Sequence, residues 1–165
     1  MRKLLILACF LAPGCGQQGG GTGNGVAPEG ATGAPRGPVQ TATLTGLYET
    51  GGTPPSQLCI TEQGRAARFG LVIRRNGRPG CSGAGTAVRS GGVLRLTMNG
   101  DSPCTIEARL EDGRLTFPAS LPATCSYYCA PGAAAGAGGM AFEKTGGTHE
   151  DARRARDIVG DRLCS

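Results

Sequence analysis

The sequence predicts a mainly β domain: a small antiparallel meander or barrel-like sheet of about seven short strands, with one C-terminal helix and stapling disulfides. Three observations lead to this fold class. Apolar and polar residues alternate along most of residues 43–117, as they do in half-buried strands. Turns rich in Gly, Asn and Asp recur between the alternating runs at regular spacing. Six cysteines follow residue 41, an even number that suits three disulfides.

The first 14 residues predict an export signal. Arg2 and Lys3 provide its basic start, and residues 4–12 form an unbroken apolar run that is too short to span a bilayer. With small residues leading up to Cys15, the segment resembles a bacterial lipoprotein signal. This resemblance implies that Cys15 is acylated and becomes the first residue of the mature chain. A cleavable signal that leaves a secreted or periplasmic soluble protein is one alternative, and acylation of Cys9 is another.

Residues 15–41 predict a lipidated, Gly-rich tether, and residues 42–165 predict a single disulfide-rich β domain. Between residues 16 and 38 the only larger aliphatic residue is Val26, so the tether buries too little apolar area to offset the entropy lost on ordering. By resemblance to bacterial sorting rules, Gly16 implies an outer-membrane location, facing the periplasm or the surface. We therefore expect a cell-envelope protein held to its membrane through N-terminal acyl chains.

The first strands follow from alternation and turn residues. A turn at Gln63-Gly64 pairs Leu58 with Phe69 and Ile60 with Ala67. Sequential strands joined by tight turns predict a small closed or half-open barrel at this chain length. Strands are expected near residues 43–49, 57–62, 66–74, 82–89, 93–98, 104–111 and 114–117.

The register of the fourth strand depends on its two flanking turns. With Asn76-Gly77 as the first turn, the inward-facing residues are Ser82, Ala84, Thr86 and Val88. A change between two and three residues in the loop at 90–92 would exchange the two faces. The next reversal is expected at residues 99–101, which read Asn-Gly-Asp.

The hairpin over residues 104–117 has the most consistent pattern in the chain. Along its first strand the apolar residues 104, 106, 108 and 110 point one way, and Thr105, Glu107, Arg109 and Glu111 point the other. Its turn, Asp112-Gly113, is one of the favoured two-residue hairpin turns. Closing the hairpin there pairs Leu110 with Leu115 and Glu111 with Arg114, and brings Ala108 opposite Phe117. Apolar residues therefore meet apolar residues, and opposite charges meet beside the turn.

One helix is predicted near the C-terminus. Thr148 is its N-cap, two acidic residues occupy its first turn, and Gly160 ends it. We expect this helix to cover an open side of the sheet, with Cys164 fastening the tail. The apolar face of the predicted helix consists of Ala152, Ala155, Ile158 and Val159.

The six cysteines of the domain predict three disulfides. A chain that returns from Phe117 alongside Cys104 brings Cys125 within reach, so Cys104–Cys125 is the first expected pair. The simplest remaining pairs are Cys59–Cys81 and Cys129–Cys164, among 15 connectivities that six cysteines allow. A zinc site is disfavoured because the cysteine pair at 125 and 129 has no matching second pair of ligands.

Charge and composition argue against nucleic-acid binding and catalysis. Without Arg2 and Lys3, 15 basic and 12 acidic residues remain, and the net charge of about +3 is spread along the chain. The only histidine, His149, is predicted at a helix N-terminus rather than beside a nucleophile, and no two carboxylates converge. We therefore expect a non-enzyme without a metal, a cofactor or a nucleic-acid partner.

Two groups of residues are candidates for binding an envelope polymer or a protein partner. Arg74, Arg75 and Arg78 share one hairpin tip, where three guanidiniums suit phosphate or carboxylate groups. The alternative is a charged turn that prevents edge pairing. Tyr127 and Tyr128 lie between two cysteines and form a candidate contact site, with one tyrosine packing into the core as the alternative.

Two short motifs resemble known families. Gly46-Leu47-Tyr48 resembles the Gly-x-Trp opening of lipocalin-like barrels, which implies a carrier of a small apolar ligand. Residues 82–86, Ser-Gly-Ala-Gly-Thr, resemble the Ser-Gly-x-x-Tyr loop of membrane-bound bacterial inhibitors of C-type lysozyme, which implies that Ser82 enters a lysozyme cleft. The domain as a whole is most similar to small lipoproteins of Gram-negative envelopes. The principal expectation is an envelope-tethered structural or binding module, with the inhibitor and the carrier as alternatives.

Overall fold

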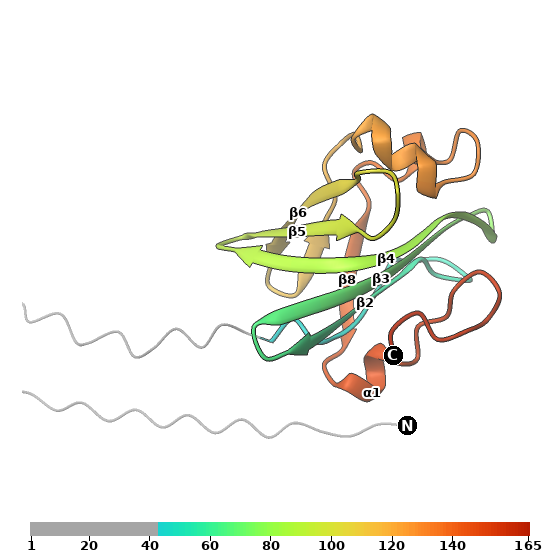
Figure 1. Ribbon diagram of the computed structural model, residues 1–165. Helices are drawn as coiled ribbons and strands as arrows, with labels where there is room; N and C mark the ends of the chain where they lie inside the picture. Colours follow the sequence, from blue (N-terminus) through green and yellow to red (C-terminus); the bar gives the residue numbers. More distant parts are fainter. Residues whose placement is uncertain (1–42) are drawn as a thin grey trace, which may run out of the picture. The chain divides into compact units, whose positions relative to one another are not determined.

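The computed structural model describes residues 43–165, which form a closed antiparallel barrel (Figure 1). Each strand pairs with the next one along the chain, and β8 pairs with β1 to close the sheet. The predicted signal peptide, Cys15 and the tether lie outside the described residues. The mainly β class is confirmed, with eight strands rather than about seven. The strands are β1 (Gly46–Glu49), β2 (Gln57–Gln63), β3 (Ala66–Arg75), β4 (Arg78–Ser90), β5 (Val93–Met98), β6 (Thr105–Glu111), β7 (Arg114–Thr116) and β8 (Ala141–Gly146).

The strand missing from the sequence prediction is β8, and it completes the barrel. Its only large apolar residue is Phe142, which is fully buried and pairs with Leu115 of β7. The other edge of β8 pairs with β1, where Tyr48 lies opposite Lys144. One large apolar residue in six gives too weak an alternation to be recognised as a strand.

The hairpin turns set the register of each strand. In the β6–β7 hairpin, Leu110 pairs with Leu115, as predicted. In the β2–β3 hairpin the predicted register is wrong by two residues, because Leu58 pairs with Leu71. The turn begins one residue later than expected: Gly64, with φ +64°, takes the first turn position, which one of the two common hairpin turns reserves for glycine. A shift by two residues leaves the same side chains facing inward.

The predicted inward face of β4 is wrong because of a β-bulge in β4 itself. The predicted turn at Asn76-Gly77 is present, but Arg74 pairs with Pro79 and Ile73 pairs with Cys81, so Gly80 is an extra residue in β4. One extra residue exchanges the two faces of a strand. Ala87 is therefore buried and Val88 is 61 % exposed, the reverse of the prediction. Ala84 and Thr86 are likewise exposed, and Ser82 is half-buried.

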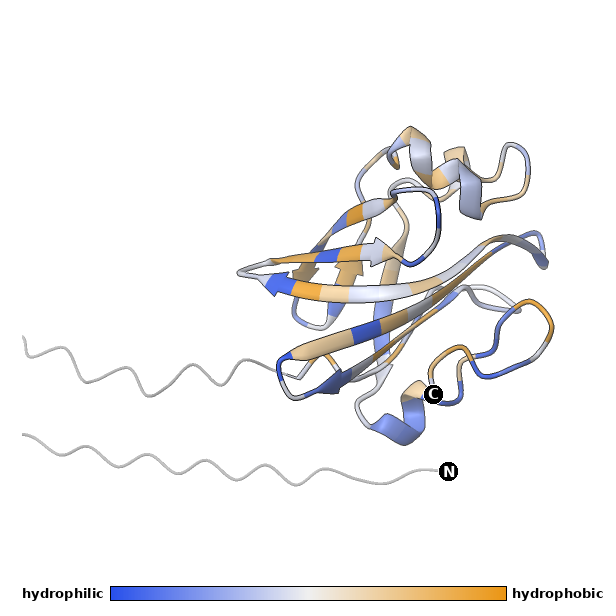
Figure 2. Cartoon of the chain, in the orientation of Figure 1, coloured by the Kyte–Doolittle hydropathy of each residue, from blue (hydrophilic) through white to orange (hydrophobic). Residues whose placement is uncertain are grey.

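Large side chains of the protein fill the barrel interior. The alternation of apolar and polar residues along the strands is visible in Figure 2. An eight-stranded barrel is just wide enough for side chains to fill it or for one small ligand to enter. Here the interior holds Tyr48, Leu58, Ile60, Phe69, Leu71, Ile73, Leu94, Leu96, Ile106, Leu115 and Phe142, none more than 2 % exposed.

The up-and-down topology gives the barrel two different ends. At one, which we call the turn end, the turns at 64–65, 91–92 and 112–113 contain two residues each. The opposite end, which we call the loop end, carries the long connections β1–β2, β5–β6 and β7–β8 and the β3–β4 hairpin tip. The β7–β8 connection contains two 3₁₀-helices, η1 (Ala123–Tyr128) and η2 (Ala134–Gly136). This connection adds Cys125, Ala133 and Ala137 to the barrel core.

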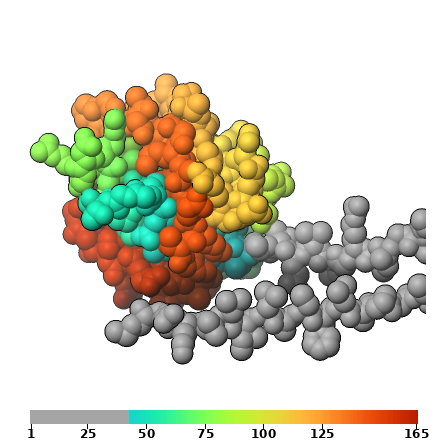
Figure 3. Space-filling model, turned by 180° about the vertical axis from the view of Figure 1, so that it is seen from behind, coloured from blue at the N-terminus to red at the C-terminus, as the bar shows by residue number. Residues whose placement is uncertain are grey.

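The predicted C-terminal helix is much shorter than expected. Helix α1 covers only His149–Ala152, although Thr148 and Asp151 form the capping box that starts it. Ala152 and Ala155 are buried as predicted, but Ile158 and Val159 lie in an exposed loop and are not on a helical face. Because the barrel is closed, α1 covers no open side; it packs outside on β1 and β2. The red C-terminal segment that contains α1 lies along the lower side of the domain in Figures 1 and 3. No helix among residues 43–165 is long and apolar enough to cross a membrane.

One predicted disulfide is confirmed, and two are corrected. Cys104 and Cys125 are bonded, as the returning chain predicted. The pairs Cys59–Cys81 and Cys129–Cys164 are wrong: Cys59 bonds Cys164, and the remaining two cysteines, at 81 and 129, bond each other. Cys59 and Cys81 flank β3 on either side and face opposite sides of the sheet. A disulfide cannot reach across an intervening strand and through the sheet.

Candidate functional site

A groove on the outside of the barrel is the candidate site among the residues that the structure describes. Its floor is the outer face of β5 and β6, and its rim is the start of the β7–β8 connection. The hollow has a volume of about 700 Å³. A second hollow of about 550 Å³ continues it over β6 and β7, and the two share Glu107 and Pro118. We call both together the outer groove. Its first part is lined by Arg95, Thr97, Thr105, Glu107, Pro118, Ser120, Leu121 and Pro122.

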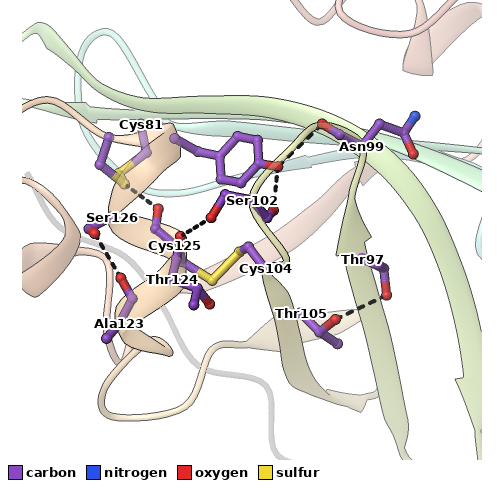
Figure 4. The surroundings of a disulfide bond; sticks show 12 residues. Cys81, Thr97, Asn99, Ser102, Cys104, Thr105, Ala123, Thr124, Cys125 and Ser126 are labelled. Atoms are coloured by element: carbon purple, nitrogen blue, oxygen red, sulfur yellow. Dashed lines mark hydrogen bonds between the residues drawn. A yellow bond between two sulfur atoms is a disulfide. The ribbon is translucent and has the colours of Figure 1, made fainter.

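Cross-strand pairs fix the floor of the outer groove. Arg95 pairs with Glu107, and the guanidinium Nη2 donates to the carboxylate Oε1 at 2.8 Å. One step along the strands, the hydroxyl oxygens of Thr97 and Thr105 are hydrogen-bonded at 3.3 Å (Figure 4). These side chains stand on paired strands, so the floor offers guanidinium, carboxylate and hydroxyl groups in fixed positions.

The rim of the groove is held by the neighbouring backbone and a disulfide. The Gly139 N–H donates to the Pro118 carbonyl at 2.8 Å, and a Cβ on Gly138 would overlap the Ala119 carbonyl oxygen. Just beyond the rim, Cys125 is bonded to Cys104, the residue before β6 (Figure 4). The position of the rim over the sheet is therefore set by the fold.

The groove carries both charges in balance. Its first part is lined by Arg95 and Glu107, and the second part adds two arginines and one glutamate. One of these arginines, Arg114, is paired at 2.5 Å with Glu143, which lies beside the lining and makes the count three arginines and three glutamates. The floor therefore has no excess charge to attract a polyanion, and it presents hydrogen-bonding groups beside the apolar edges of Leu121 and Pro122.

The three arginines of the β3–β4 hairpin are not brought together as one anion site. The Arg74 Nη2 donates to the Asp157 carbonyl at 3.3 Å, whereas Arg75 packs against Gly136 in η2. Arg78 pairs with Arg75 in the strand register and is exposed. Neighbouring residues of a strand point to opposite faces, which separates the first two guanidiniums.

Ser82, the residue suggested by the lysozyme-inhibitor motif, lies inside a strand. It is half-buried in β4 and pairs with Val72 of β3. The glycines of the same motif are needed for packing, because a Cβ on Gly85 would overlap the Thr97 carbonyl oxygen. The segment is therefore part of the sheet and does not project as a loop.

The two predicted contact tyrosines have different environments. Tyr128 is half-buried against the barrel core, and its hydroxyl donates to the Ser102 carbonyl at 2.7 Å. Tyr127 is 65 % exposed, and its ring meets that of Tyr128 edge-on at a centroid distance of 5.2 Å. One tyrosine thus anchors η1 and the other remains on the surface.

No metal centre is present among the residues that the structure describes. No group of three or more His, Cys, Asp or Glu residues in that part of the chain could hold a metal ion. The six domain cysteines are used in disulfides, and His149 is exposed as the first residue of α1.

A second polar cluster, at the turn end, holds the start of the domain against the barrel. The Glu62 carboxylate accepts hydrogen bonds from the Thr43 hydroxyl, the Leu44 N–H at 3.0 Å and the Thr45 N–H at 3.2 Å. The Lys144 ammonium donates to the Thr43 carbonyl at 2.6 Å and lies 5.6 Å from the centre of the Tyr48 ring. This cluster fixes residues 43–45, the first residues that the structure describes.

The same cluster shifts the pKa values of its members. Burial alone raises the pKa of Glu62, but the hydrogen bonds from Thr43, Thr45 and Leu44 outweigh it and bring the pKa below its ordinary value of 4.5. Burial, followed by the nearby Glu62 carboxylate, raises the pKa of Tyr48 to about 12 against an opposing effect of Arg89. Glu62 is therefore charged and Tyr48 neutral at pH 7.

We predict that the domain loses stability in acid because the stabilising contribution of the Glu62 carboxylate is lost when it is protonated. Because the pKa of Glu62 is lowered by folding, its contribution is fully present above its unfolded pKa and is lost as pH falls through the folded value. Urea midpoints at pH 7 and pH 3 should differ less for Glu62→Gln than for the unchanged chain. Glu150→Gln, an exposed glutamate in α1, is the control. Equal acid sensitivity of the unchanged chain and Glu62→Gln would contradict this role.

The outer groove was only partly visible in the sequence. The alternation over residues 104–111 correctly put Thr105, Glu107 and Arg109 on the outward face of a strand. Nothing in the sequence indicated that residues 118–122 would lie above that face. No protein-family model, curated protein or solved structure matches this chain, so the site has to be interpreted from its own geometry.

Proposed function

We propose that this protein is an exported, membrane-tethered binding module that takes an uncharged or zwitterionic envelope polymer in the outer groove. The observation that carries the proposal is the groove itself: a fixed floor of paired charges and hydroxyls below an apolar rim. A polar chain such as the amide-bearing glycan of a bacterial cell wall offers the matching donors and acceptors. The tether and Cys15 would keep the module near that polymer, and no catalytic step is assigned.

The charge balance of the groove supports a ligand without a large net charge. A strongly anionic polymer would need unpaired guanidiniums, yet Arg95 and Arg114 already have carboxylate partners. Both pairs are exposed, so they contribute little to folding and their groups remain accessible to a ligand. Hydroxyls at Thr97, Thr105 and Ser120 add uncharged hydrogen-bonding groups.

The two alternative functions receive less support from the geometry. An apolar ligand would have to displace the large side chains that fill the barrel, among them Tyr48, Phe69 and Phe142. A lysozyme inhibitor of the kind that the sequence resembles would need a projecting loop at Ser82, which instead pairs within the sheet. Binding in the outer groove requires neither displacement of the core side chains nor a projecting loop at Ser82.

The proposal predicts that filling the groove weakens binding to cell-wall polymer. The full chain with Cys15→Ser, which removes the proposed acylation site, is mixed with purified peptidoglycan and sedimented. Thr105→Trp from the floor and Ser120→Trp from the rim should each lower the affinity by roughly tenfold or more, because direct contacts to the polymer are lost. Ala66→Trp, on an exposed position at the turn end, should bind like the parent.

Circular dichroism and a urea midpoint establish that each tryptophan variant is folded. The rim variant changes an exposed loop residue, so it keeps the test valid even if the floor variant destabilises the sheet. The proposal is wrong if the parent chain does not sediment with peptidoglycan, or if both groove variants bind as well as Ala66→Trp.

A further inference from the structure

Residues 156–162, which we call the docking loop, present an apolar tip at the loop end of the barrel. Ile158 is 52 % exposed and Val159 is 76 % exposed, and the two are adjacent in sequence. Single exposed aliphatic residues are ordinary on a protein surface, but two adjacent β-branched residues at a loop tip form a projecting apolar point. The tip is visible in orange in Figure 2, within the red C-terminal segment of Figure 1.

The docking loop is held open by its own hydrogen bonds. The Asp157 carboxylate Oδ1 accepts from the Val159 N–H and from the Asp161 N–H, both at 2.9 Å. The Asp157 N–H donates to the Asp161 carbonyl at 2.9 Å. At the base of the loop, the backbones of Arg156 and Arg162 form an isolated antiparallel β-bridge. This internal bonding fixes the loop in a conformation that leaves its aliphatic side chains outside.

The base of the docking loop is fastened to the barrel on two sides. Cys164, two residues beyond the loop, is bonded to Cys59 in β2. The Leu163 N–H donates to the Ala155 carbonyl at 3.1 Å, and Leu163 packs closely over Gly70 of β3. The Arg74 guanidinium donates to the Asp157 carbonyl at 3.3 Å. The loop is therefore a fixed projection next to the β3–β4 hairpin.

Basic residues outnumber acidic ones around the apolar tip. The docking loop and the adjoining hairpin residues 74–78 contain five arginines and two aspartates. One of these aspartates, Asp157, is occupied by backbone N–H groups of its own loop. Arg75 is not counted among the arginines of this region, because its guanidinium lies against Gly136 in η2. We call the remaining region the arginine–aliphatic surface, formed by Arg74, Arg78, Arg156, Arg162, Ile158 and Val159.

We propose that the arginine–aliphatic surface docks the domain on an anionic lipid membrane. Ile158 and Val159 would enter the boundary between headgroups and acyl chains, and the arginines would bind lipid phosphates. Each basic residue near an anionic membrane surface adds a modest attraction, so several arginines and a small apolar point give reversible binding. The inference goes beyond the groove and does not depend on the ligand proposed for it.

A lipid surface fits this region better than a protein partner. A stable protein interface buries roughly 800 Å² on each side around a core of aromatic and apolar residues. The arginine–aliphatic surface offers two exposed aliphatic side chains with arginines in the same loop and in the neighbouring hairpin, and it contains no aromatic residue. A narrow apolar point with a basic surround matches the depth and the charge of a membrane interface.

The chain contains no tryptophan, which allows a direct test. In the full chain with Cys15→Ser, Val159→Trp reports on the tip, and Val88→Trp, on an exposed valine of β4, is the matched control. Each is mixed with vesicles of phosphatidylglycerol and phosphatidylcholine, or of phosphatidylcholine alone. We expect a blue-shifted tryptophan emission only for Val159→Trp with the anionic vesicles, and the shift should decrease with added salt.

Two further variants separate the contributions of the surface. Ile158→Ser with Val159→Ser, and Arg78→Gln with Arg162→Gln, should each weaken vesicle sedimentation by roughly tenfold. The charge control is Arg65→Gln with Arg68→Gln, both exposed near the turn end of β3, and it should bind normally. The proposal is overturned if Val159→Trp shows no shift, or if the serine variant binds fully. It is also overturned if the serine variant converts a dimer to a monomer in sedimentation velocity, which would make this surface a contact between two copies.

Discussion

Replacing Cys59 and Cys164 together with alanine is expected to lower the free energy of unfolding by about 5 kcal/mol, more than removal of either other disulfide. The reason is chain entropy: this bond joins residues 105 positions apart, and the stabilisation by a cross-link grows with the size of the loop that it closes. The same relation gives about 4 kcal/mol for Cys81–Cys129 and about 3 kcal/mol for Cys104–Cys125, which close shorter loops.

The effect of removing Cys59–Cys164 should also be local. The bond lies outside the barrel, in a small cluster with Leu47, Ala152 and Ala155, whereas the main core contains neither cysteine. Strand content measured by circular dichroism should therefore persist while protease cleavage within residues 156–162 accelerates. Guanidinium midpoints for the three double alanine variants provide the comparison. A smaller loss at 59 and 164 than at 104 and 125 would contradict the entropic account.

Local sequence patterns were sufficient to predict the β6–β7 hairpin but not the long-range contacts. Its turn, alternation and charge pairing all agree within a dozen residues, and Cys125 follows soon enough to be placed beside Cys104. The partner of Cys59 depends on the last residues of the chain returning past β2, which no periodicity encodes. Local sequence patterns therefore predict pairing between segments that are close in sequence. Contacts between distant segments, such as Cys59 with Cys164, follow from how the closed barrel folds.

The fourth strand illustrates how one residue can reverse a prediction. The Asn76-Gly77 turn was placed correctly, with φ values of 51° and 75°. The bulge at Gly80, opposite Ile73 and Arg74, then exchanged the two faces of β4. Short side chains over residues 81–87 gave no apolar signal strong enough to reveal the change. The lysozyme-inhibitor resemblance of Ser82 also rested on this segment.

The part of the candidate site that lies on strands could be predicted from the sequence, but the part formed by the β7–β8 connection could not. Thr105 and Glu107 were placed on an outward face because a strand alternates with period two. The groove also needs residues 118–122, whose position is set by the Gly139–Pro118 hydrogen bond and the close approach at Gly138. The same period of two separates Arg74 from Arg75, so their shared hairpin tip was a misleading indicator of an anion site.

Gly85→Ala is expected to destabilise the barrel by roughly 3 kcal/mol, which corresponds to a melting temperature about 10 °C lower for a domain of this size. Gly85 pairs with Phe69 on one side and Met98 on the other, at a point where β4 passes very close to β5. An added Cβ would overlap the Thr97 carbonyl oxygen and lie 2.9 Å from the Phe69 ring. Backbone cannot move aside as a flexible side chain can, so β5 itself must shift.

Gly92→Ala is the matched control, because a Cβ there finds its nearest neighbour, the Leu110 carbonyl oxygen, at 3.8 Å. It should leave the melting temperature nearly unchanged or raise it slightly through a less flexible unfolded chain. Since Thr97 lies in the groove floor, the shift of β5 in Gly85→Ala should also weaken peptidoglycan binding below the melting transition. Equal melting temperatures for Gly85→Ala and Gly92→Ala would mean that β4 and β5 are not packed as closely as described. A stability loss without a binding loss would instead separate the position of Thr97 from ligand recognition.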